Sequence, residues 1–89
     1  MSASRTSPLE FPCSFPVKVF GRDEDEFETL IVSIIQRHVP ELHPENISSR
    51  LSDGGKYLAV TATFIADSRE QLDALYMELS AHDRVLMVL

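Results

Sequence analysis

Apolar and polar residues alternate along three stretches of the chain, as they do in strands that bury one face. These stretches cover residues 15–20, 47–52 and 57–66, and the alternation is weakest in the second. Asp53-Gly54-Gly55 separates the last two and predicts a hairpin turn, because tight turns need residues that tolerate positive φ. Residues 84–89 are predicted to form a fourth strand.

Two further segments repeat apolar residues at helical spacing. The first helix is predicted from about Asp23 to His38, with Asp23 and Glu26 at the spacing of a capping box. The second is predicted to begin at Asp67 or Ser68 and to end before residue 82. Their apolar stripes consist of Phe27, Leu30, Ile31, Ile34, Ile35 and Val39, and of Leu72, Leu75, Tyr76 and Leu79.

The order of elements is βαββαβ, which folds most simply as an α+β, ferredoxin-like sandwich. We expect an antiparallel sheet in the order 4-1-3-2, with both helices on one face. The predicted core consists of Val17, Val19, Leu30, Ile31, Ile34, Val60, Ala62, Phe64, Leu72, Leu75, Leu79, Val85 and Met87.

The length of 89 residues allows one domain, which we place at 11–89 behind a disordered tail at 1–10. The net charge of −6 argues against nucleic acid and anionic membranes as partners. No apolar run could span a bilayer, and no apolar signal segment begins the chain. The single cysteine cannot form an internal disulfide, so we expect a cytoplasmic protein.

Much of the acidity lies in one cluster, Asp-Glu-Asp-Glu-Phe-Glu at residues 23–28. Carboxylates in the first turn of a helix are stabilised by the helix dipole. A metal site is the alternative interpretation, but the glycine and closing glutamate of a calcium loop are missing. We therefore favour a helix start and expect no metal.

Helices on one face would leave the other face of the sheet open, and its occupants are more apolar than solvent contact requires. An exposed patch of this kind indicates a protein partner or a homodimer surface, whereas scattered surface hydrophobes are the alternative. RNA-binding domains of this architecture carry a basic and aromatic pattern on the third strand, which is missing here. The face is predicted to contain Lys18, Phe20, Tyr57, Thr61, Thr63, Ile65, Leu86 and Val88.

Other candidates for chemistry are weaker. The histidines lack metal-ligand spacing, and Cys13 has no histidine near it in sequence, so we expect no catalytic residues and no cofactor. Gly21-Arg22-Asp23 lies at a strand-to-helix turn, where backbone N–H groups can hold a carboxylate or phosphate. We retain these three residues as a candidate site for a small-molecule effector.

The chain also resembles the YbeD-like family, small bacterial proteins of unknown function. The resemblance covers about residues 11–89 and implies a ferredoxin-like fold similar to the ACT-type regulatory domains of amino-acid metabolism. It suggests a link to lipoate metabolism by association. It is carried by Phe11-Pro12, Phe15, Lys18-Val19-Phe20-Gly21, Gln36-Arg37-His38-Val39-Pro40, Ser52, Gly55, Tyr57, Leu75-Tyr76 and Val85-Leu86-Met87-Val88-Leu89.

Two functions follow from these observations. The first is a non-enzymatic regulatory or protein-interaction module that acts through its open sheet face. The second is an ACT-type sensor of an amino acid or carboxylate at Gly21, Arg22 and Asp23, the position to which the resemblance assigns an effector.

Overall fold

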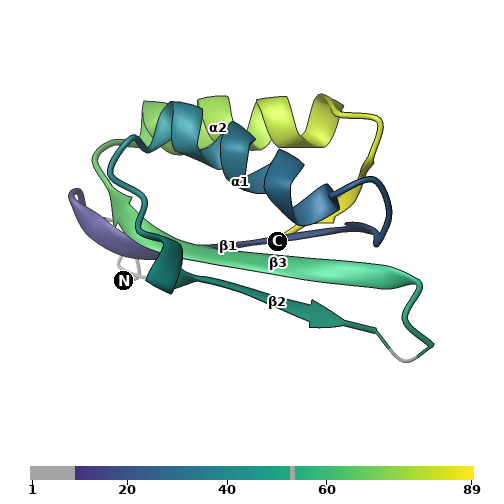
Figure 1. The fold of residues 1–89 in the computed structure, drawn as a ribbon. Helices are drawn as coiled ribbons and strands as arrows, with labels where there is room; N and C mark the ends of the chain where they lie inside the picture. Colours follow the sequence, from purple (N-terminus) through teal and green to yellow (C-terminus); the bar gives the residue numbers. More distant parts are fainter. Residues whose placement is uncertain (1–9, 53) are drawn as a thin grey trace, which may run out of the picture.

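A computed structural model describes residues 10–52 and 54–89, so most of the predicted tail lies outside the described residues. Two helices form one layer and a four-stranded sheet forms the other (Figure 1). The elements are β1 (Cys13–Arg22), α1 (Phe27–His38), the short 3-10 helix η1 (Pro44–Asn46), β2 (Ile47–Leu51), β3 (Tyr57–Ala66), α2 (Arg69–Ala81) and β4 (Val85–Val88).

The strand order is β2-β3-β1-β4 and every pair is antiparallel, which confirms the predicted fold and sheet order. β1 and β3 pair along their whole length, from Cys13 opposite Ala66 to Arg22 opposite Tyr57. The predicted hairpin between β2 and β3 is confirmed by their antiparallel pairing, and Gly54 and Gly55 have φ of 87° and 71°, whereas Asp53 of the predicted turn lies outside the described residues. These conformations suit glycine because it has no Cβ.

The core lies between the helices and the covered face of the sheet, and most of the predicted core residues are buried there. Leu30 and Val85 are only half-buried, at the margin of the core. The prediction for Met87 was wrong, because this residue is 53% exposed. The core also includes residues that the prediction omitted: Phe27, Ile35, Val39, Leu42, Leu58 and Ala66.

A register shift in the pairing of β1 with β4 explains the error at Met87. Phe20 pairs with Met87, whereas its neighbour Gly21 pairs with Val85, so one residue of β4 is left over between them. Such a bulge interrupts the alternation of faces. Met87 therefore shares the open face with Phe20, while Val88, which was predicted for that face, packs against the core. Leu86 is 60% exposed at the bulge.

Helix α1 begins at Phe27, so the predicted start at Asp23 and the capping box of Asp23 with Glu26 were wrong. Asp25 and Glu26 have positive φ, 50° and 56°, and form a left-handed turn before the helix. The guanidinium of Arg84 donates hydrogen bonds to the carbonyl oxygens of Glu24 and Asp25, at 3.0 Å to the latter. A distant side chain thus stabilises a turn that local sequence does not predict.

Helix α2 begins as predicted. The Ser68 hydroxyl accepts a hydrogen bond from the Gln71 N–H at 3.1 Å, and the Gln71 side chain accepts one from the Asp67 N–H at 2.7 Å. These bonds satisfy N–H groups that a helix start leaves without partners.

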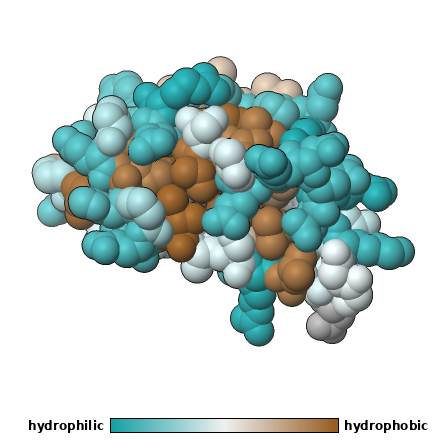
Figure 2. Space-filling model, in the orientation of Figure 1, coloured by the Kyte–Doolittle hydropathy of each residue, from teal (hydrophilic) through white to brown (hydrophobic). Residues whose placement is uncertain are grey.

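The helix layer does not cover the whole sheet. Ile47 of β2 is half-buried and Leu51 is 53% exposed, although both lie on the covered side of their strand. Apolar surface is visible beside the helix layer when the molecule is seen from the β2 side (Figure 2). A cavity of about 390 Å³ lies here, lined in part by Val32, Pro44 and Ile47.

Candidate functional site

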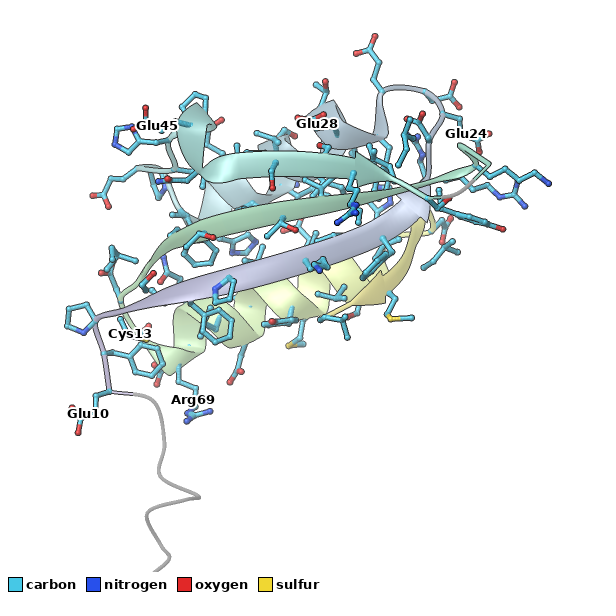
Figure 3. All side chains as sticks on the ribbon, turned by 90° about the horizontal axis from the view of Figure 1, so that it is seen from below. Glu10, Cys13, Glu24, Glu28, Glu45 and Arg69 are labelled. Carbon is cyan, nitrogen blue, oxygen red and sulfur yellow. The ribbon has the colours of Figure 1, made fainter. Side chains whose placement is uncertain are left out.

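The open face of the sheet brings the predicted interaction residues together. Lys18 lies opposite Thr61, and Phe20 lies opposite Ala59. Tyr57, opposite Arg22, is 40% exposed, and Ile65 is 56% exposed. In the view from below, the sheet lies in front and neither helix covers this face (Figure 3).

Sequence reasoning missed several residues of this face. Arg22 follows Phe20 by two positions on β1, and Arg50 of β2 lies opposite Ala59. Met87 and Leu89 flank them on the β4 side, where Leu89 exchanges backbone hydrogen bonds with Lys18 at 2.8 and 3.1 Å. The alternation of β2 and the hairpin turn would have indicated Arg50, whereas Met87 could not be found without the bulge.

A hollow of about 360 Å³ lies in this face between β1, β3 and β2. Ala59 stands between Phe20 and Arg50 in one cross-strand row. Its methyl group is too short to fill the space between the longer side chains. The hollow is lined by Lys18, Phe20, Arg50, Leu51, Ser52, Tyr57, Leu58 and Ala59.

The charge of the strands is opposite to that of the whole chain. The four strands contain Lys18, Arg22 and Arg50 but no aspartate or glutamate, although the protein has 14 acidic residues. Glu24, Glu28 and Glu45 lie outside the strands, before α1, in α1 and in η1 respectively (Figure 3). Within the described part of the chain, ion pairs join only Arg37 and His38 to Glu78, on the helix layer.

Gly21 and Arg22, which were predicted for a strand-to-helix turn, are the last two residues of β1, and only Asp23 lies beyond the strand. The space on the inner side of Gly21 is occupied. A Cβ at Gly21 would lie 2.3 Å from the ring of Phe27 and 2.6 Å from the carbonyl oxygen of Arg84, so only glycine fits. The Asp23 N–H donates to the Lys56 carbonyl at 2.9 Å. Arg22 is exposed and lines a small cavity of about 160 Å³ with Arg84, Glu24, Asp83 and Leu86.

The histidines and the cysteine are dispersed. His38 contacts Glu78 at 2.7 Å between Nε2 and Oε1, while the ring of His82 accepts a hydrogen bond from the Arg84 N–H at 3.1 Å. Cys13 is half-buried at the start of β1. Across residues 10–52 and 54–89, no three His, Cys, Asp or Glu side chains converge as metal ligands would.

Glu78 holds the two helices together. Its second carboxylate oxygen lies 2.5 Å from a guanidinium nitrogen of Arg37. The hydrogen bond from His38, with a further contribution from Arg37, lowers the pKa of the Glu78 carboxyl. The amide of Gln71 adds a hydrogen bond to the His38 carbonyl at 2.8 Å. This cluster joins residues about 40 positions apart, so no local motif reveals it.

The fold and the open face define a small α+β sandwich with one uncovered, partly apolar and basic sheet surface. No helix in the described ranges is long and apolar enough to cross a membrane. Residues 6–89 match the family model described as "Protein of unknown function (DUF493)". The chain belongs to this family, which confirms the resemblance to small bacterial YbeD-like proteins.

Relatives match over nearly the whole chain. A UPF0250 protein of Chromobacterium violaceum is 43% identical and covers all of both chains. UPF0250 protein RSc0326 of Ralstonia nicotianae is 47% identical over 96% of this chain and 88% of its own. The solution structure of protein HP0495 from H. pylori has a TM-score of 0.75 at 13% identity, covering 100% of this chain and 94% of that one. This last likeness concerns the fold alone.

Proposed function

We propose that this protein is a non-enzymatic regulatory or protein-interaction module, and that the open face of the sheet is its binding surface. The observation that carries the proposal is the composition of this face. Apolar side chains from β1, β3 and β4 share it, and neither of the described helices α1 and α2 covers them. Contiguous exposed apolar surface on a small protein is typical of interaction sites.

The binding surface is supported by its layout as well as by its composition. Phe20 and Tyr57 come from the two central strands and border the hollow beside Ala59. Aromatic side chains are enriched at the centres of protein interfaces, where they fill pockets of the partner or form the walls of one. A partner side chain inserted beside Ala59 would be enclosed between them.

The test compares capture of a partner, or self-association, by matched variants. Tyr57→Ala removes an exposed aromatic of the open face, and Met77→Ala removes a 72% exposed apolar side chain of the helix layer. We expect a specific partner, or a dimer seen by light scattering, to be retained by Met77→Ala and lost by Tyr57→Ala. A monomer that retains no partner, or a partner insensitive to Tyr57→Ala, would contradict the proposal.

A second candidate is sensing of a small carboxylate or amino acid beside Gly21, Arg22 and Asp23. It is favoured by one observation: Arg22 and Arg84 line the same small cavity. Guanidinium groups are well suited to carboxylates because they offer a planar fork of N–H donors. The resemblance to YbeD-like proteins adds lipoate-related acids to the compounds worth testing.

A thermal-shift screen with amino acids and lipoate-related acids tests the second candidate. A ligand at 100 times its Kd stabilises the folded state by about 2.7 kcal/mol, so the melting temperature rises by several degrees. The rise should disappear in Arg22→Ala. A flat screen, or a rise that Arg22→Ala leaves unchanged, would refute sensing at this turn.

A further inference from the structure

The open face joins an apolar centre to a cationic border. Phe20 lies between Lys18 and Arg22, each two residues away on β1. Side chains two residues apart on a strand lie on the same face about 7 Å apart. Arg50 closes a third side, across Ala59 from Phe20. Lys18 and Arg50 therefore line the hollow itself, and Arg22 lies beyond Phe20 on the same face.

These cations have no partner of opposite charge among the described residues. Asp23 and Glu24, the carboxylates nearest to Arg22 in sequence, lie in the segment before α1, and the ion pairs within residues 10–52 and 54–89 all involve Glu78 on the far layer. Lys18, Arg22 and Arg50 are exposed. The chain has 14 acidic and eight basic residues, so its composition alone would favour acidic side chains on the open face. The absence of acidic residues from the four strands therefore does not follow from the composition.

We propose that the partner of the open face is an acidic protein segment in which an apolar side chain is flanked by carboxylates. The inference rests on the proposed function and specifies the chemistry of the partner. The apolar side chain would occupy the hollow beside Ala59. The flanking carboxylates would lie against Lys18 on the β1 side of the hollow and against Arg50 on the β2 side. Interfaces of this kind combine a desolvated centre with a polar border.

The same charges do not favour nucleic acid. A strand of nucleic acid presents a long row of phosphates, and tight binders contact about 6–10 of them. Here only three basic residues lie on the strands, and the acidic segment at residues 23–26 begins directly after Arg22. A backbone extending along β1 past Arg22 would meet those carboxylates.

The experiment selects binders from a displayed library of random peptides, using the full chain as the target. We expect the selected sequences to carry Asp or Glu on both sides of a Leu, Ile, Phe or Met. The same selection on Arg50→Glu should lose these sequences, whereas Arg69→Glu, an identical charge change at an exposed site on α2, should retain them. Affinity for a synthetic peptide of the consensus should fall at least tenfold in Arg50→Glu.

Nuclear magnetic resonance shifts locate the bound peptide and distinguish the two proposals. Neutral or basic peptides that shift open-face residues would overturn the acidic partner but leave the binding surface standing. Peptides that shift only the helix layer, or no selected peptide at all, would overturn both. Tighter binding of single-stranded oligonucleotides than of the selected peptides would also overturn the acidic-protein inference.

Discussion

The covered face of the sheet is apolar and close-packed, whereas the open face mixes aromatic, hydroxyl and basic side chains. Val17, Val19, Val60 and Ala62 on the covered side are fully buried, while their neighbours one residue away reach solvent. One backbone thus serves two purposes, because successive side chains of a strand point to opposite faces. The comparison indicates that folding depends mainly on the covered set of residues, which leaves the open set for the binding that we propose.

The largest expected difference between the faces concerns truncation of an aliphatic side chain. Leu75 is fully buried against the covered face, and Ile65 is 56% exposed on the open face. Leu75→Ala should lower the free energy of unfolding by about 2–5 kcal/mol, because it leaves a cavity. Ile65→Ala should cost less than about 1 kcal/mol. Urea unfolding measures both losses of unfolding free energy, and equal losses would contradict the expected difference between the covered and open faces.

A methyl group added on the covered side should also destabilise the fold. Gly21→Ala places its Cβ against Phe27 and the Arg84 carbonyl, and overpacking of this kind costs about 1–3 kcal/mol. Thr63→Ala on the open face is the control, with an expected loss below about 1 kcal/mol. Combining Gly21→Ala with Phe27→Leu should cost less than the sum of the two single changes, because the shorter side chain relieves the contact. Strict additivity would argue against the clash.

Helix α2 carries a side-chain cap at its N-terminus. Ser68→Ala removes the hydroxyl that accepts the Gln71 N–H, with an expected loss of about 1 kcal/mol. Ser80→Ala changes the same residue type near the other end of α2, where Ser80 is exposed within the helix. It should be neutral or slightly stabilising, since alanine is the better helix former. Equal losses in chemical denaturation would contradict a capping role.

The smallest effect concerns the contact between the helices and is a dependence on pH. The pKa of Glu78 is lowered in the folded state, chiefly by the hydrogen bond from His38. Its contribution to stability is therefore complete above the unfolded pKa of about 4.3. It is lost as the pH falls through the lower, folded pKa. Glu78→Gln should flatten this part of the stability curve, and an unchanged slope would show that the cluster contributes nothing.

The sequence predicts elements well where their signals are local. Strand β3 and helix α2 lie where alternation, the Gly54-Gly55 turn and the Ser68 cap place them. The topology follows because few arrangements of βαββαβ bury both helices on one sheet. The start of α1 could not be predicted, because Arg84, nearly sixty residues away, stabilises the left-handed turn at Asp25 and Glu26.

The candidate surface was predicted in part. Alternation places Lys18, Phe20, Tyr57, Thr61 and Thr63 on one face, and the structure confirms that they share it. The prediction for β4 was wrong because a bulge reverses the expected faces of Met87 and Val88. The absence of acidic residues from the strands is visible only after the strands are delimited, because it depends on where each strand begins and ends.

The charged residues of the strands are all basic, whereas the acidic residues of the described chain lie in loops and helices, so the charge is unevenly distributed over the molecule. The acidic partner that we propose would be repelled at long range by the net charge of −6, but at contact it would meet the basic side chains of the open face, Lys18, Arg22 and Arg50. Salt at physiological concentration limits the reach of exposed charges to about 8 Å, which is less than the spacing of about 10 Å between packed layers. Moderate salt would thus screen the distant repulsion more than the near attraction, so that association is fastest at intermediate ionic strength.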